Sequence, residues 1–248
     1  MTEKLNITRI FNAIWDLYKD HAGILLTTAL VIYLGAAIVV GLFILVSPIL
    51  AILSAVLVFV ASFWYQGMVI ELVNRIHANQ PRPTVGTLFS AIGPKLGTLI
   101  GAGLLAGIGI TIGLILLIVP GLYLLTIWAV IAPVIIIEGA RVTESFGRSQ
   151  QLVRGNGWAV FGTVAIIAFL SSAIGQFIRI IVGGDSFVGG MLGTLIPGII
   201  LAPVGALAAA VLYFELVRVK EGGVAAAAPI PSAAAPTPAG TQPPPPPQ

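Results

Sequence analysis

The stretch that decides the fold is "LLIVPGLYLLTIWAVIAPVIIIEGARVTESFGRSQQLVRGNGW", from Leu116 to Trp158. It is almost wholly apolar as far as Ile137, and from Glu138 onward it carries acids, arginines and glutamines. The hydrocarbon core of a bilayer requires about 20 consecutive apolar residues in a helix. The abrupt change at Glu138 therefore indicates that the chain leaves lipid for water at this point.

The composition of the whole chain is typical of a membrane protein. Apolar residues make up 58% of its 248 residues and charged residues only 8%, whereas a soluble domain has about 25% charged residues. The apolar runs are continuous rather than alternating, which favours helices over a membrane β-barrel. There are no cysteines, and the net charge of +3 comes without a basic stripe that would suggest nucleic acid binding. We therefore predict an all-α, integral membrane helical bundle that does not bind nucleic acid.

Six transmembrane helices are predicted, grouped as three hairpins in a membrane domain of residues 1–220. The spans cover residues 24–46, 49–73, 97–118, 122–138, 159–182 and 191–216. We place the turn of the second hairpin at Pro120-Gly121, because proline followed by glycine favours a turn. A kink within one re-entrant element is the alternative, since proline is also tolerated in membrane helices. Residues 221–248, rich in alanine and proline, are predicted to form a disordered cytoplasmic tail.

The basic residues indicate how the chain is oriented. Eleven of the twelve lysines and arginines lie in the two terminal segments or in the two long loops, and only Arg179 lies toward the other face. Because loops rich in lysine and arginine stay in the cytoplasm, both termini and both long loops should be cytoplasmic. This predicts a multi-pass protein of the bacterial cytoplasmic membrane whose basic side chains contact anionic lipids.

Short amphipathic helices are expected on the cytoplasmic surface. Residues 8–20 have one apolar side, which suits the membrane interface, and packing on other parts of the protein is an alternative. Residues 144–154 form a second surface helix with Thr143 as its N-cap, and Arg148 lies roughly opposite its apolar side. Segments beginning at Thr8, Thr84 and Thr143 share the order threonine, surface helix, span, so we interpret the domain as three copies of one unit.

Each predicted hairpin ends in a glutamate that is soon followed by an arginine. The pairs are Glu71 with Arg75, Glu138 with Arg141, and Glu215 with Arg218. Their helical spacing places both members of a pair on one face of a helix. Such groups mark an ion or proton pathway in some membrane proteins. We favour the simpler interpretation, an ion pair at the cytoplasmic end of a span.

Glycines in the third span are predicted to let another helix approach closely, because small residues permit tight packing in a membrane. They are Gly97, Gly101, Gly103, Gly107, Gly109 and Gly113.

No combination of residues predicts a catalytic, cofactor or metal site. His21 and His77 are isolated in the sequence, whereas a zinc site or a nucleophilic site requires several converging groups. No serine elbow and no phosphate-binding loop is found. We therefore predict that the chain is not an enzyme.

The region 116–158 together with "LYFELVRVKEGG" (212–223) resembles the membrane domain of bacterial glycerophosphoryl diester phosphodiesterases and related uncharacterised inner-membrane proteins. The resemblance rests on Pro120-Gly121, Trp128, Pro133, Glu138, Glu144-Ser145, Arg148-Ser149, Leu152-Val153, Gly155, Trp158, Tyr213, Glu215, Arg218 and Glu221. The family often has aspartate where this chain has Glu215. Because the acidic metal ligands of the soluble phosphodiesterase barrel are not found here, the resemblance implies a multi-span membrane domain without catalytic residues.

These observations predict a non-enzymatic membrane scaffold or regulatory domain with a protein partner. The alternative is a small transporter, channel or lipid-handling protein. In that case Glu71, Glu138 and Glu215 would converge on a water-accessible cavity.

Overall fold

The computed structural model describes residues 5–46, 50–182 and 187–221, which are helical apart from short turns and contain no strand. Within these ranges six helical stretches are long and apolar enough to cross a membrane. The structure thus confirms an all-α bundle of the multi-pass membrane class. The predicted tail lies outside the described residues, apart from Glu221 at its start.

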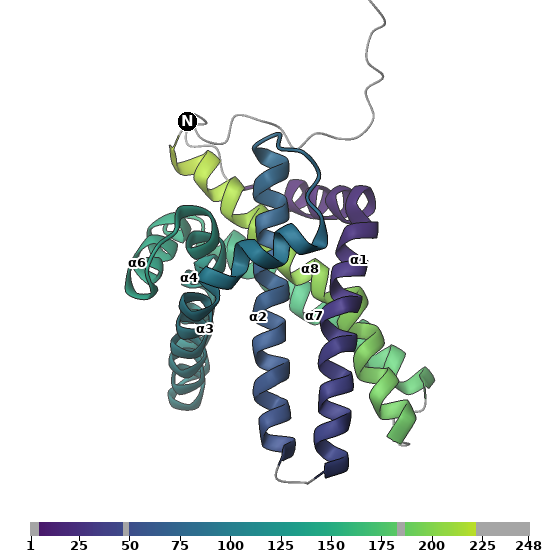
Figure 1. Cartoon of the computed structure of the whole chain (residues 1–248). Coiled ribbons are helices and arrows are strands. Elements are labelled where there is room, and N and C mark those ends of the chain that lie inside the picture. The colour runs from purple at the N-terminus through teal and green to yellow at the C-terminus, as the bar shows by residue number, and fades with distance from the viewer. Residues whose placement is uncertain (1–4, 47–49, 183–186, 222–248) are drawn as a thin grey trace, which may run out of the picture.

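Three helical hairpins build the bundle (Figure 1). The first pairs α1 (Ile7–Val46) with α2 (Leu50–His77), and the third pairs α7 (Gly157–Val182) with α8 (Phe187–Glu221). In the second, α3 (Val85–Leu116) pairs with α4 (Ile118–Ile127), which is followed by the short α5 (Ile131–Pro133) and the π-helix η1 (Val134–Glu138). A short helix, α6 (Val142–Val153), connects the second and third hairpins.

Three short helical segments lie across one end of the bundle, which we call the charged end (Figure 1). They are residues 7–20 of α1, residues 85–95 of α3, and α6. The backbone of α1 is non-helical at His21 (φ −122°, ψ 16°), where the surface segment meets the span. In α3 the segment ends next to Pro94, whose missing N–H favours a bend.

Each surface segment buries one side against the rest of the protein. The buried side chains are Ile10, Ile14 and Leu17 in α1, Leu88 and Ile92 in α3, and Leu152 and Val153 in α6. For residues 8–20 the structure therefore supports packing on protein, and Trp15 on the opposite side stays exposed. The helix predicted at 8–20 is confirmed, and α6 begins slightly earlier than the predicted 144–154.

The second hairpin is confirmed, but its turn is at Leu117 and not at Pro120-Gly121. Leu117 is extended (φ −159°, ψ 136°) and separates α3 from α4. Pro120 lies in the first turn of α4, where a backbone N–H has no helical acceptor and its absence costs little. Gly121 is needed because the two helices nearly touch: a Cβ there would lie 2.4 Å from Cγ of Leu114.

The fourth span, predicted as one helix over 122–138, is broken. Helix α4 ends at Ile127, residues 128–130 form a turn, and the chain becomes helical again as α5 and η1. Pro133 contributes to the break, because it has no N–H to donate to the carbonyl of Ala129 four residues earlier.

Side chains from two surface segments hydrogen-bond to carbonyls of the broken span. Ser149 Oγ, on α6, donates to the carbonyl of Ile127 at 2.8 Å. Lys95 Nζ, on α3, donates to the carbonyl of Ile136 at 2.6 Å. Irregular backbone at membrane depth is tolerated where protein groups satisfy it in this way.

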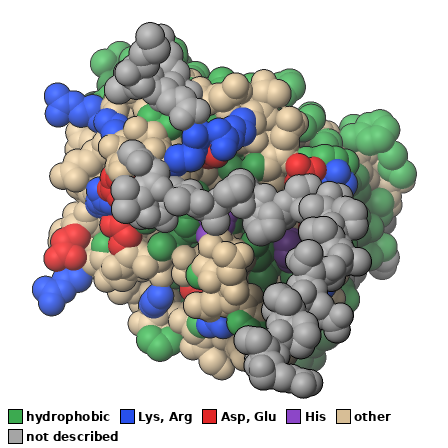
Figure 2. All heavy atoms as spheres, turned by 90° about the horizontal axis from the view of Figure 1, so that it is seen from above, with side chains coloured by type: hydrophobic (Ala, Val, Ile, Leu, Met, Phe, Trp, Pro, Cys, Tyr) green, Lys and Arg blue, Asp and Glu red, His purple; other side chains and the backbone are tan. Residues whose placement is uncertain are grey.

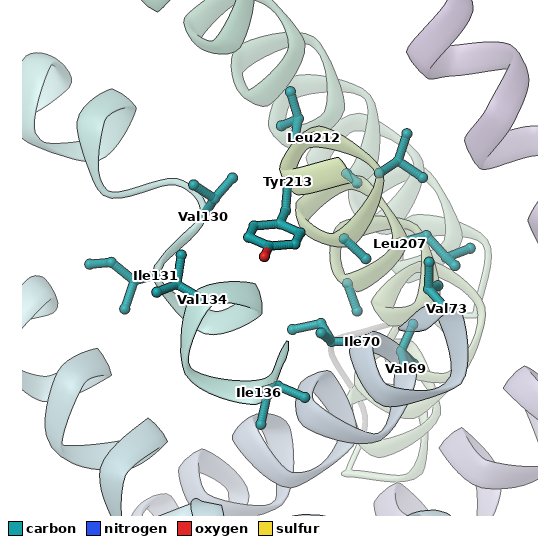
Figure 3. Close-up of a cluster of buried hydrophobic side chains, with 14 of the residues drawn as sticks. Val69, Ile70, Val73, Val130, Ile131, Val134, Ile136, Leu207, Leu212 and Tyr213 are labelled. Atoms are coloured by element: carbon teal, nitrogen blue, oxygen red, sulfur yellow. The ribbon is translucent and has the colours of Figure 1, made fainter. Parts of the chain in front are cut away.

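The apolar core lies where the last helical stretches of the three hairpins meet (Figure 3). Its labelled members are Val69, Ile70 and Val73 of α2, Val130, Ile131, Val134 and Ile136 around the broken span, and Leu207, Leu212 and Tyr213 of α8. Each stretch adjoins one of the three predicted glutamates. Corresponding parts of the three units therefore supply the core, as the three-copy interpretation implies.

The glycines of α3 differ in their surroundings. At Gly103, Gly109 and Gly113 a Cβ would lie within 3.0 Å of Phe63, Trp128 and Gly121, respectively, so close packing is confirmed there. A Cβ at Gly101 would make only ordinary contact with Val142. At Gly97 and Gly107 nothing lies within 4 Å of such a Cβ, and the predicted close packing is wrong at these two positions.

Candidate functional site at the charged end

Lysine, arginine and acidic side chains gather on the charged end, which Figure 2 views directly. The three predicted glutamates all lie near this end, because each stands at or close to the last turn of its hairpin. Glu71 and Glu215 are each only 8% exposed. Carboxylates this far from water require partners.

Two of the three predicted ion pairs are present. Arg75 Nε donates to Glu71 Oε1 at 2.8 Å, one helical turn away on α2. Arg218 Nη2 donates to Glu215 Oε2 at 2.7 Å on α8. Arg9 of the α1 surface segment also reaches Glu215, with Nε 3.5 Å from Oε1. Helical spacing therefore predicted the local pairs but missed the contact from Arg9.

The third predicted pair is wrong, because the partner of Glu138 is Arg148 and not Arg141. Arg148 Nε lies 3.0 Å from both carboxylate oxygens of Glu138. Gly139 adopts a left-handed conformation (φ 71°, ψ 20°) that ends η1. The helical spacing that would bring Arg141 beside Glu138 is lost at this glycine.

Arg141 instead occupies the N-cap of α6, which was predicted for Thr143. The backbone N–H of Arg141 donates to Glu144 Oε2 at 3.0 Å. Glu144 thus bonds back to the start of the helix, in a position where its negative charge suits the helix dipole. Thr143 lies inside α6.

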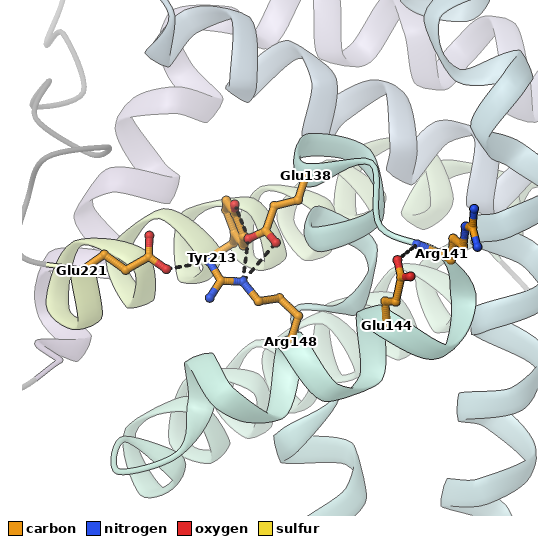
Figure 4. A network of polar contacts seen from close by, with 6 residues as sticks. All are labelled: Glu138, Arg141, Glu144, Arg148, Tyr213 and Glu221. Atoms are coloured by element: carbon orange, nitrogen blue, oxygen red, sulfur yellow. Dashed lines mark hydrogen bonds and ion pairs between the residues drawn. The ribbon is translucent and has the colours of Figure 1, made fainter.

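Arg148 is the centre of a network that ties three elements together (Figure 4). Besides Glu138, its Nη2 contacts Glu221 Oε1 at 2.6 Å. The hydroxyl of Tyr213 donates to Glu138 Oε1 at 2.9 Å. The network therefore joins α6 to η1 and to two positions on α8.

The environment keeps Arg148 charged. Burial lowers the pKa of its guanidinium, but the hydrogen bonds to Glu221 and Glu138 outweigh burial, so its pKa lies above the ordinary value. The sequence predicted that Arg148 lies opposite the apolar side of α6. This prediction is wrong, because the guanidinium of Arg148 turns toward the protein. The sequence alone offered no periodic signal for this contact.

Helix α6 presents its other side to the surroundings. Its buried side chains are Ser145, Ser149, Leu152 and Val153. Exposed polar side chains in and beside it are Arg141, Thr143, Glu144, Gln150, Gln151 and Arg154. The network thus holds a short helix against the bundle while one polar face stays accessible.

The two histidines differ in their surroundings. Nδ1 of His21 is buried and has no hydrogen-bond partner in the described ranges. His77 stacks on Phe214 with ring centroids 3.8 Å apart, and its Nδ1 lies 3.0 Å from the carbonyl of Val73. In the part of the chain that the structure describes, no group of three or more His, Cys, Asp or Glu is arranged to hold a metal ion.

A groove of about 640 Å³ lies between α2, the α4 region, α7 and α8. Its lining is mainly apolar, and Glu71, Glu138 and Glu215 are not part of it. The convergence on a cavity that the transporter alternative requires is therefore not seen at this groove.

Fold and site define a class of protein, the multi-pass helical membrane bundle with a charged, ion-paired end. No protein-family model, no curated protein and no solved structure matches the chain. The resemblance to the membrane domain of glycerophosphoryl diester phosphodiesterases stays a prediction.

Proposed function

We propose that this chain is a non-enzymatic scaffold or regulatory protein of a bacterial cytoplasmic membrane. Its charged end and both termini face the cytoplasm, and the outer face of α6 binds a partner protein. The observation that carries this proposal is the network around Arg148, which holds α6 in a defined position with a polar face exposed.

A binding surface gains affinity when it is ordered before the partner arrives, because less conformational entropy is lost on binding. Helix α6 meets this condition. Arg148 anchors it to Glu138 and Glu221, and Ser149 anchors it to the backbone of the broken span. A surface helix held by lipid alone would lack this fixed register.

The ion pairs argue against the transporter or channel alternative. An ionisable group on a transport pathway faces a water-filled cavity. Glu71 and Glu215 are instead nearly buried and paired with arginines on their own helices. Their charges are balanced inside the fold, as expected of groups that stabilise a structure.

The exposed basic residues support the proposed orientation. Lys19, Arg154 and Lys220 are exposed, and each belongs to an element that reaches the charged end. Lysines and arginines at this level attract anionic headgroups, which are enriched on the cytoplasmic leaflet. Anionic lipids are therefore proposed as the second class of partner.

Photo-crosslinking in cells tests the proposal. A photoreactive amino acid in place of Gln151, on the outer face of α6, should give one protein adduct of defined mass at high yield. The matched control is the same amino acid in place of Phe169, an exposed apolar position on α7, which should give lipid adducts only. Arg148→Gln should lower the Gln151 adduct severalfold, because α6 loses its anchor.

Lipid adducts alone at Gln151 would overturn the partner proposal. Ion flux through vesicles containing the purified chain would support the alternative function, provided that the triple change Glu71→Gln, Glu138→Gln and Glu215→Gln abolishes it.

A further inference from the structure

The groove beside the core has the dimensions of a single hydrocarbon chain. Its lining follows α8 from Pro197 to Leu212, about 22 Å at 1.5 Å per residue. A volume of about 640 Å³ over that length leaves a mean cross-section of roughly 30 Å², whereas a helix with its side chains is about 10–12 Å wide. Carbon atoms in contact lie about 4 Å apart, so one extended alkyl chain fits within the groove, whereas a helix would protrude from it.

The lining carries no charge. Most of it consists of small or aliphatic side chains from α7 and α8, among them Ala168, Gly175, Ala202 and Gly205. No Asp, Glu, Lys, Arg or His belongs to it. An ionised group placed there would be costly without a counter-charge. The ligand is therefore uncharged along the part that enters the groove.

Polar groups nevertheless border the groove, namely the side-chain amide of Gln66 and the hydroxyls of Ser171 and Ser172. Gln66 contributes an amide that has no hydrogen bond to any group in the described ranges. It precedes Glu71 on α2 by about 7.5 Å along the helix axis, which places it inside the apolar region. Ala129, in the break of the fourth span, also lines the groove.

An amide without a partner in an apolar setting is costly. A ligand that carries a hydroxyl or amide at this level would bond to the Gln66 side chain, which offers both a donor and an acceptor. We propose that the groove binds a single-chain, uncharged lipid whose hydrogen-bonding group meets Gln66 and whose alkyl chain lies along α7 and α8. This proposal is independent of the scaffold function and goes beyond it.

The test uses the purified full chain in lipid nanodiscs and a photoreactive monoacylglycerol with a diazirine in its sixteen-carbon chain as the probe. Labelling should saturate with probe concentration and should map to groove residues on α7 and α8. Ala202→Leu, which adds side-chain volume to the groove, should lower saturable labelling at least tenfold.

A smaller groove beside α3 supplies the matched control. It is lined by Phe59, Gly103, Leu104, Gly107, Ile108, Thr111 and Ile112. Gly107→Leu fills that groove and should leave the labelling of α7 and α8 unchanged. The change is expected to be tolerated, because nothing lies within 4 Å of a Cβ at Gly107.

Gln66→Leu keeps the proposal testable if Ala202→Leu does not fold. This change should reduce the preference for the monoacylglycerol over the corresponding alkane probe about fivefold, the effect of losing one neutral hydrogen bond. An unchanged preference would overturn the role of Gln66. Equal labelling of both grooves would overturn the site, and so would crosslinks between two copies of the chain through α8, which would show that a helix covers the groove.

Discussion

The charged end and the opposite half of the bundle are held together in different ways. Near the charged end the last stretches of the three hairpins bury many apolar side chains, and Ile70 is 0% exposed. In the opposite half large apolar side chains such as Ile38, Leu117 and Ile180 are exposed. Lipid tails solvate these side chains as well as protein does, so no hydrophobic force draws the helices together there. Specific packing is concentrated where polar groups must be satisfied.

The individual spans show the same contrast. In the most apolar window of α7 only 6% of the residues are buried, against 44% in the fourth span and in α8. The broken span is thus central to the fold, and α7 is peripheral. The apolar groove lies between the more buried fourth span and α8 and the peripheral α7.

The largest effect is expected at the tip of the second hairpin, which is tightly packed although it lies in the half whose side chains are otherwise exposed. Gly121→Ala would place a Cβ 2.4 Å from Leu114 Cγ and 2.6 Å from its backbone nitrogen. Because backbone cannot yield as a side chain does, we expect a loss of about 3 kcal/mol. Unfolding in mixed micelles, followed by tryptophan fluorescence, measures it. Gly107→Ala, with open space around it, is the control; equal effects would show that the tip is not tightly packed.

Matched isoleucines test the contrast itself. Ile70 is 0% exposed and Ile38 is 56% exposed. Ile70→Ala should cost about 2 kcal/mol, mainly through the cavity that it leaves, since the unfolded reference in lipid is also apolar. Ile38→Ala should cost little, because lipid fills the space. The same unfolding titration gives both values, and a large cost at Ile38 would contradict a lipid-solvated outer half.

A smaller effect is expected at the ion-pair network. Its measurement shows whether Arg148 or Arg141 is the partner of Glu138. Arg148 and Glu138 have side chains that are 31% and 26% exposed, so partial screening reduces their interaction. We expect about 1 kcal/mol of coupling in a double-mutant cycle of Arg148→Gln and Glu138→Gln. The same cycle with Arg141→Gln should give none. Coupling between Glu138 and Arg141 instead would show that the local pair forms, and it would refute the network.

The smallest effect is expected where α6 bonds to the broken span. Ser149→Ala removes the donor to the carbonyl of Ile127 and should cost about 0.6 kcal/mol, as hydrogen bonds between membrane helices do on average. Ser90→Ala is the control, since Ser90 bonds to its own helix at Gly86. Faster amide exchange at residues 128–130 in the Ser149 variant, and not in the Ser90 variant, would locate the loss at the break. No difference between the two would show that Ser149 does not support it.

Several features of the site were accessible from the sequence because they are local. Glu71 with Arg75 and Glu215 with Arg218 are one helical turn apart, and the helix continues between them. Glu138 did not follow this rule, since Gly139 ends its helix. Pro133 and Gly139 were visible signals of an interrupted span, but their presence does not say which distant side chains bond to the freed backbone.

Taken by itself, the sequence determined the number of spans, the helical class and the end at which charge collects. These depend on bilayer thickness, helix rise and the cost of placing charge in hydrocarbon, which act on each stretch separately. Only the tertiary structure decided the partner of Glu138, the turn at Leu117, the break in the fourth span and the groove beside Gln66. Those features arise from contacts between segments far apart in the chain, and no local periodicity encodes them.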